Sequence, residues 1–178
     1  MIASRVLGVD PGLGGALALI EDGVTRQLVA VEDMPTEAKT FGSGRQVYVG
    51  GLVAMLRALE PSIAFIERSQ PMQGRGKRQS PAGAFSMGDS FGALRAVTEA
   101  LAIPTIFVPA NTWKTAMGLM GKRKSAEAPV TMARQVYPSA EPYLRRKMDH
   151  DRAEAILIAQ WGIVHHLATE ANRRAKCK

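Results

Sequence analysis

Acidic side chains end two apolar segments of the chain and begin a third. Asp10 and Glu67 each follow a short apolar run with the length and composition of a buried strand. Asp151 and Glu154 stand three residues apart where an amphipathic segment begins, so a helix would project both from one face. If the two strands are neighbours and the helix docks on them, four carboxylates meet in one place.

Carboxylates gathered in this way repel one another unless divalent cations neutralise them. Oxygen ligands suit Mg²⁺ or Mn²⁺, and two such ions about 3.5–4 Å apart can activate a water and stabilise the leaving oxygen of a phosphodiester. The acids therefore predict a nuclease that holds two Mg²⁺ ions per site, with Mn²⁺ as a substitute. Plainer interpretations exist for each part, namely a turn at Asp10-Pro11-Gly12 and acids that favour the helix dipole by about 0.3–1 kcal/mol.

Asp149 competes with Asp151 for the fourth ligand position. Asp149 is the better N-cap of the last helix, where its carboxylate would accept a backbone N–H bond. If the helix begins later, Asp149 would supply the ligand and Asp151 would face solvent. Both residues therefore stay candidates at this point.

Strands and helices alternate in a way that predicts an α/β layer fold with a five-stranded mixed sheet flanked by helices. Three antiparallel strands come first, then a helix, and then further strands and helices in turn. The expected strands are 6–9, 16–20, 27–31, 63–66 and 105–108, and the expected helices are 49–59, 81–101, 111–117, 125–137 and 149–164, with a surface loop over 33–46. Sites in such sheets form beyond the carboxyl ends of the strands, where Asp10 and Glu67 both lie.

The length, charge and cysteine content of the chain limit the kinds of protein that it can be. The chain has 178 residues and a formal net charge of +7, which indicates one domain over residues 1–170, a basic tail over 171–178 and a polyanionic partner. Cys177 is the single cysteine, so no intrachain disulfide and no thiolate zinc cluster can form. No apolar stretch has the length of a membrane span and no signal peptide pattern is present, so we expect a cytoplasmic protein, bacterial or in a phage-infected host.

This order of motifs resembles the RuvC-type Holliday-junction resolvases of the RNase H-like superfamily, especially their phage branch. The resemblance rests on three segments in the same order, Leu7-Gly8-Val9-Asp10-Pro11-Gly12, Ala64-Phe65-Ile66-Glu67 and Asp151-Arg152-Ala153-Glu154-Ala155-Ile156. It implies an RNase H-like three-layer fold, with Asp10, Glu67 and Glu154 at the metal-ligand positions of the family and Asp151 at the fourth. It also implies a homodimer that resolves four-way DNA junctions and leaves 5′-phosphates.

The resemblance gives a role to lysines after the last strand as well. Lys114 and Lys124 fall at places where the family contacts DNA near the scissile phosphate, so both are candidates for contact with the phosphate and for stabilising charge in the transition state. Loops that carry further basic residues would hold the phosphate backbone or would simply face solvent. These candidates for DNA binding are Arg75, Lys77, Arg78, Lys122 and Arg123, and a third basic cluster follows at residues 145–147.

Ala84, Gly88, Gly92 and Ala96 recur every fourth residue in the expected helix 81–101. Such a stripe indicates either close packing of the helix on the sheet or a dimer interface, and a two-fold dimer matches the symmetry of a four-way junction.

Other functions share some of these features. The same acids would serve a nuclease for RNA·DNA hybrids or structured RNA, and a protein that only binds nucleic acid would need the basic loops alone. The glycines after Asp10 also resemble the first phosphate loop of actin-like ATPases and sugar kinases. Those proteins need a second such domain, for which 178 residues are too few, so we expect no nucleotide cofactor.

Overall fold

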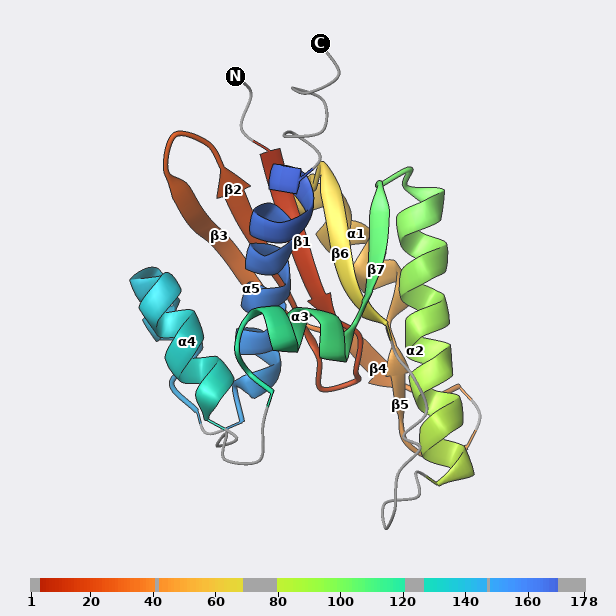
Figure 1. Cartoon of the computed structure of the whole chain (residues 1–178). Coiled ribbons are helices and arrows are strands. Elements are labelled where there is room, and N and C mark those ends of the chain that lie inside the picture. Colours follow the sequence, from red (N-terminus) through yellow and green to blue (C-terminus); the bar gives the residue numbers. More distant parts are fainter. Residues whose placement is uncertain (1–3, 41, 69–79, 121–126, 147, 170–178) are drawn as a thin grey trace.

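A five-stranded mixed sheet runs through the middle of the protein, with helices on both of its faces (Figure 1). The computed structural model describes residues 4–40, 42–68, 80–120, 127–146 and 148–169. The strands of the sheet lie in the order β3, β2, β1, β6, β7, and their bounds are β1 Ser4–Asp10, β2 Ala16–Asp22, β3 Arg26–Asp33, β6 Ile63–Arg68 and β7 Thr105–Pro109. The first three strands pair antiparallel, whereas β6 runs parallel to both β1 and β7. The predicted three-layer arrangement is confirmed.

Helices α1 (Val49–Leu59) and α2 (Pro81–Ala100) cover one face of the sheet. The other face carries α3 (Ala110–Ala116), α4 (Ala128–Val136) and α5 (His150–Trp161), and α5 lies directly across β1 and β2 (Figure 1). A 3-10 helix, η1 (Pro138–Tyr143), leads toward α5, and a π-helical segment, η2 (Gly162–Leu167), continues it.

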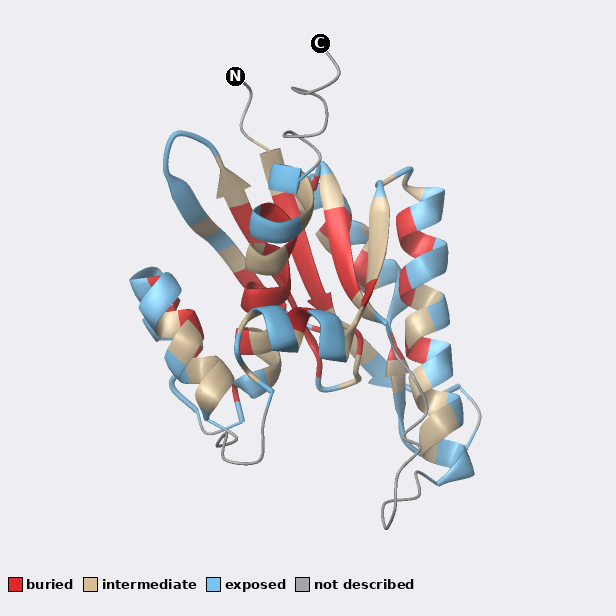
Figure 2. Cartoon of the chain, viewed as in Figure 1, coloured by how far each residue is buried: buried red, intermediate tan, exposed pale blue. Residues whose placement is uncertain are grey.

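Side chains on the central strands alternate between two buried cores, as the two-residue period of a strand requires. On β1, Val6 packs in the core beneath α5, and Leu7 packs in the core beneath α1 and α2. Phe65 of β6 belongs to the α5 side and Ile66 to the opposite side. Because both faces of these strands are covered, β1 over residues 6–9 and β6 over residues 63–66 are uninterrupted apolar runs, each followed by an acid (Figure 2).

Several predicted boundaries are confirmed. Helix α2 begins after Ser80, whose Oγ accepts a hydrogen bond from the backbone N–H of Gly83 at 3.1 Å, and Pro81 occupies the first helical position. Helix α1 spans the expected residues and ends at Glu60, which has a left-handed φ of 42°.

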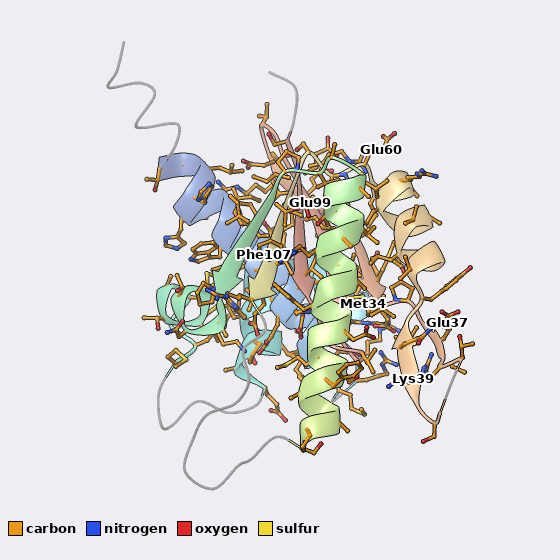
Figure 3. All side chains as sticks on the ribbon, turned by 90° about the vertical axis from the view of Figure 1, so that its right-hand side faces the viewer. Met34, Glu37, Lys39, Glu60, Glu99 and Phe107 are labelled. Atoms are coloured by element: carbon orange, nitrogen blue, oxygen red, sulfur yellow. The ribbon has the colours of Figure 1, made fainter. Side chains whose placement is uncertain are left out.

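Two expectations were wrong. The segment 33–46 is not only a loop, because β4 (Thr36–Ala38) and β5 (Arg45–Val47) form a small antiparallel sheet beside α2. The helix expected over 111–117 begins before its predicted first residue, at Ala110 directly after Pro109. Figure 3 looks onto α2 and shows Glu37 of β4 and Glu60 on one side of it, with Phe107 of β7 on the other.

The small-residue stripe of α2 faces away from the sheet. Gly88 and Gly92 are exposed, and a Cβ atom added at either would meet nothing within 4 Å. The helix packs on the sheet through another face, which buries Leu94 and Val97. The expectation that the stripe serves close packing on the sheet was therefore wrong.

Gly8 lets α5 lie directly on β1. A Cβ atom at Gly8 would stand 2.1 Å from the carbonyl oxygen of Ala155 and 2.4 Å from the nitrogen of Ala159, both of them backbone atoms of α5. We expect Gly8→Ala to lower the free energy of unfolding by about 2–3 kcal/mol, because the helix must move away from the strand. Urea denaturation measures this change.

Gly88→Ala is the matched control for that substitution. The added methyl group meets open space in the middle of α2, where alanine favours the helix by about 0.5–1 kcal/mol. Gly88→Ala should therefore be neutral or stabilising. Equal stability of the two variants would contradict the close approach of α5 to β1.

None of the helices in the described ranges combines the length and the apolar character needed to cross a membrane.

Candidate active site

Asp10 and Glu67 meet at one edge of the sheet. Strands β1 and β6 are parallel neighbours in which Val9 is paired with Ile66. Asp10 and Glu67 are the next residues of the two strands, so they lie side by side at the end of the pair. Asp10 lies two residues after Gly8 and Glu67 two residues after Phe65, and both of those residues face α5. The strand period therefore turns both carboxylates toward α5, and the predicted neighbourhood of the two strand ends is confirmed.

Helix α5 adds Asp151 and Glu154 to the same place. The close contact of α5 with β1 at Gly8 holds the first turns of the helix over the ends of β1 and β6. The charges of Asp151, Glu67 and Glu154 all act on Asp10. The structure thus brings the four acids of the sequence prediction into one electrostatic cluster, which we call the acid cluster (Asp10, Glu67, Asp151 and Glu154).

The acid cluster holds negative charge in a poorly solvated place. Burial, then the charges of Asp151, Glu67 and Glu154, raise the pKa of Asp10 from 3.8 to about 8, against a hydrogen bond from the Gly12 backbone. Burial also raises the pKa of Glu67, although Lys114 and Trp113 oppose it. A carboxyl group that keeps its proton near neutral pH indicates that positive charge is in short supply there.

Two adjacent residues of α3 hold Glu67. Trp113 is fully buried, and its Nε1–H donates a hydrogen bond to Glu67 Oε2 at 2.8 Å. Lys114 Nζ lies 2.8 Å from Glu154 Oε2 and 3.9 Å from Glu67 Oε2. The sequence identified Lys114 as a candidate for contact with the phosphate and for stabilising charge in the transition state, and Trp113 only as part of a helix.

The missed role of Trp113 had a signal in the sequence. Strand β7 is the parallel neighbour of β6, so the segment that follows β7 begins at the same edge as Glu67. A tryptophan N–H in a buried place needs an acceptor, and a strand-end carboxylate nearby can provide it.

The donor set of the acid cluster fits a hard divalent cation, because all of its ligand atoms are carboxylate oxygens. In their present positions, however, no three His, Cys, Asp or Glu side chains of the described residues stand close enough together to hold an ion. The ammonium group of Lys114 contacts two of the carboxylates instead, and His150 Nε2 lies 2.9 Å from Asp151 Oδ1. The chemistry of the site therefore fits a metal whose binding requires these contacts to change.

Asp149 does not join the acid cluster. It stands at the N-cap position of α5, but its buried carboxylate makes no cap to the helix and accepts hydrogen bonds from the backbone N–H and the Nε–H of Arg146, at 2.6 and 2.9 Å. The expectation that its side chain caps α5 was wrong. Because both oxygens of Asp149 are occupied, Asp151 is the better candidate for the fourth ligand position.

A second ion pair fixes the start of α5 to the sheet. Arg152 donates two hydrogen bonds to Asp33 at the end of β3, from Nε at 2.6 Å and from Nη2 at 2.7 Å, and a third to the Tyr143 carbonyl at 3.1 Å. This hydrogen bonding lowers the pKa of Asp33. The pair spans 119 positions of sequence, so no local pattern could have predicted it.

We expect Arg152→Ala to lower the free energy of unfolding by about 1–3 kcal/mol, because the bidentate pair is lost and buried Asp149 loses one of its two cations. Urea denaturation is the measurement. Arg26→Ala is the matched control, since it breaks an exposed Arg26–Asp22 pair that should be worth less than about 0.5 kcal/mol. Equal losses in the two variants would show that the Asp33–Arg152 pair does not hold α5.

A cavity of about 510 Å³ opens beside the acid cluster. Gly14 and Asp151 line one part of it, and a Cβ atom at Gly14 would lie 3.3 Å from Asp151 Oδ2. Arg45 and Arg146 line it as well, and both are exposed. Positive side chains thus stand at the border of the negative site, which is the arrangement that an approaching phosphate chain requires.

The other predicted DNA contacts cannot be placed. Arg75, Lys77, Arg78, Lys122, Arg123 and Lys124 lie outside the described residues. Of the predicted basic clusters, Lys114 lies at the acid cluster, and Arg145 and Arg146 are exposed on the segment before α5.

The chain resembles known proteins in sequence and in fold. No protein-family model matches the chain. The chloroplastic Holliday junction resolvase MOC1 of Chlamydomonas reinhardtii is 30% identical over 161 residues. That match covers 78% of this chain but only 18% of the algal protein, so the chain spans about a fifth of the length of this relative.

Solved structures agree in fold. RuvC of Thermus thermophilus, determined with a Holliday junction substrate, has a TM-score of 0.60 at 20% identity, over 87% of this chain and 92% of RuvC. The Fowlpox virus resolvase, determined with its Holliday junction DNA, has a TM-score of 0.52 at 14% identity, over 88% of this chain and 94% of the viral one. The chain is thus similar in sequence to part of a Holliday junction resolvase, and it has the fold of RuvC and of the viral resolvase.

Proposed function

We propose that the chain is a Mg²⁺-dependent endodeoxyribonuclease that resolves four-way DNA junctions by hydrolysis and leaves 5′-phosphates. The observation that carries this proposal is the acid cluster, four carboxylates at one sheet edge in a chain with a net charge of +7. One protein named as a Holliday junction resolvase shares 30% of the aligned residues, and two proteins whose structures were determined with Holliday junction DNA share the fold. Acid cluster and relatives therefore support the same activity independently.

Asp10, Glu67, Asp151 and Glu154 are the residues that would hold the metal, which we propose to be two Mg²⁺ ions, replaceable by Mn²⁺. When bound, such ions neutralise the acids, activate a water and stabilise the leaving oxygen. Other residues of the chain position the acids and the substrate. Trp113 orients Glu67, the Asp33–Arg152 pair fixes the start of α5, and exposed arginines beside the cavity attract the phosphate backbone.

The proposed substrate needs two matching cuts, so we propose a homodimer as the working form, because a four-way junction has approximate two-fold symmetry. The outward stripe of α2, with exposed Gly88 and Gly92 and the exposed Phe85, is the surface that we assign to the partner copy. Sedimentation of the full chain should give the mass of two copies.

A cytoplasmic location and a phage source remain predictions, and the algal relative is chloroplastic.

A cleavage assay in Mg²⁺ tests the function. A four-way junction, a linear duplex of the same sequence and an RNA·DNA hybrid are given to the full chain in parallel. We expect paired cuts in the junction, with ligatable 5′-phosphates, and little cleavage of the other two. Preferred cleavage of the hybrid would replace the proposal by an RNase H-like activity, and binding without cleavage of any substrate would leave only a nucleic-acid-binding protein.

A further inference from the structure

Lys114 is held in place between two carboxylates of the acid cluster. Its Nζ lies 2.8 Å from Glu154 Oε2 and 3.9 Å from Glu67 Oε2, and its side chain is only 25% exposed. Among the described residues, no other lysine or arginine forms an ion pair with either of these acids. The burial of Lys114 disfavours its charge, but the hydrogen bond to Glu154 and the charges of Glu154, Glu67 and Asp10 outweigh this and raise its pKa.

Trp113 keeps this ammonium group where it is. The indole ring is fully buried, and its N–H is already bonded to Glu67. Lys114 Nζ lies 5.0 Å from the centroid of the same ring, a distance at which a cation is attracted to the ring face. The position of the ammonium group is therefore determined from two sides, by the carboxylates and by the indole.

We propose that Lys114 is an internal counter-cation, which neutralises Glu67 and Glu154 in the metal-free protein and gives up these oxygens when a divalent cation binds. This inference rests on the proposed function, since it assigns the metal to the acid cluster. The ammonium group and the cation compete because they use the same carboxylate oxygens. Two positive groups cannot both occupy contact distance of one carboxylate oxygen without strong repulsion between them.

The exchange also couples metal to DNA. An ammonium group released from Glu154 is free to pair with a phosphate of the nucleic acid, the role that the resemblance gives to Lys114. A phosphate that takes the ammonium group removes the competitor of the metal, so DNA should tighten metal binding. By thermodynamic reciprocity, the metal should tighten DNA binding by the same factor.

Binding of Mn²⁺ to the full chain without DNA tests the competition. Electron paramagnetic resonance of free Mn²⁺ gives the affinity for wild type, Lys114→Met, Lys114→Arg and, as a control, Arg57→Met. Arg57 is exposed on α1, so its replacement removes one charge away from the site. We expect Lys114→Met to bind Mn²⁺ at least about tenfold more tightly than wild type, because a unit charge about 4 Å away is removed. Lys114→Arg should stay near wild type, and Arg57→Met should change the affinity less than about twofold.

Unchanged or weaker Mn²⁺ binding by a folded Lys114→Met variant would overturn the counter-cation role while leaving the proposed function standing. Absence of Mn²⁺ binding in every protein, wild type included, would overturn the proposed function itself. A second measurement does not depend on the variant folding. In wild type with ¹³C-labelled lysines, the Cε signal of Lys114, assigned from Lys114→Arg, should move on titration with Mg²⁺, and a signal that stays fixed while Mg²⁺ binds would overturn the exchange.

Discussion

Asp10→Asn should abolish cleavage of a synthetic four-way junction in Mg²⁺, with a loss of rate on the order of 10³-fold or more, and should leave binding of the junction intact. A loss of this size corresponds to about 4 kcal/mol in the barrier. Glu67→Gln should behave in the same way. Cleavage is measured under single-turnover conditions, so that the rate reports the chemical step, and binding is measured in EDTA, where no metal contributes to the affinity.

The reason lies in the charge of the ligand and not in its shape. Asparagine has nearly the same size as aspartate but carries no charge, so the cluster loses one of the four carboxylates that would attract a divalent cation. The exposed basic side chains beside the cavity are unchanged, and the neutral amide leaves less negative charge near the phosphates. Binding should therefore stay the same or become tighter.

Asp22→Asn is the matched control, because it makes the same chemical change at the opposite end of the neighbouring strand. Asp22 belongs to an exposed ion pair with Arg26 and lies at the far end of the β1–β2 register from Asp10. Its loss should leave cleavage within about twofold of wild type. Full activity of Asp10→Asn, or an equal loss in Asp22→Asn, would remove Asp10 from the active site.

The positions of Asp10 and Glu67 could be predicted because two simple patterns coincide there. A buried strand is apolar on both faces, so its first acid marks the point where it leaves the core, and parallel neighbours end at the same edge. Glu154 and Asp151 followed from helical spacing at the start of an apolar helix. Local periodicity was enough to predict the place of each acid on its strand or helix. The topology of the fold brings the four acids together.

The hydrogen-bond partners of Asp149, Asp33 and Glu67 could not be predicted in this way. Asp149 looked like an N-cap or a ligand because its position in the sequence allows both. Its actual partner Arg146 is three residues away, and its choice depends on the bend of the backbone before α5. The partner of Asp33 is 119 residues away, and the hydrogen bond from Trp113 to Glu67 spans 46. Such pairs depend on three-dimensional packing that no spacing rule encodes.

Short elements were the other source of error. Strands β4 and β5 have three residues each, too few for an alternating pattern to stand out from a polar segment that contains glycine. The α2 stripe failed for a different reason. Small residues at every fourth position define one face of the helix, but they do not say whether that face turns to the sheet or away from it. Gly88 and Gly92 turn away.

The metal-free protein should become less stable as the pH rises from about 5 to about 8, because Asp10 loses its proton in this window. In the folded protein the pKa of Asp10 is about 8, against 3.8 without the fold. Between these values the unfolded chain has released the proton and the folded chain still binds it. The stabilisation from proton binding is fully present below about pH 4 and is lost as the pH rises through the folded pKa of about 8.

The expected loss is about 3–4 kcal/mol over this window, since each pKa unit corresponds to about 1.4 kcal/mol and the folded group is only half ionised at the upper end of the window. For a chain of this size that amounts to a fall of roughly 10 °C in Tm, measured by calorimetry in EDTA. Asp10→Asn cannot lose a proton there, so its Tm should fall much less. The fall that remains comes from the raised pKa of Glu67 and Asp151.

Saturating Mg²⁺ should raise the Tm of wild type at about pH 8 and not that of Asp10→Asn, because a ligand stabilises only the state that binds it. A wild-type Tm that is constant across the window, or one that falls in parallel in Asp10→Asn, would show that Asp10 does not carry the unbalanced charge of this site.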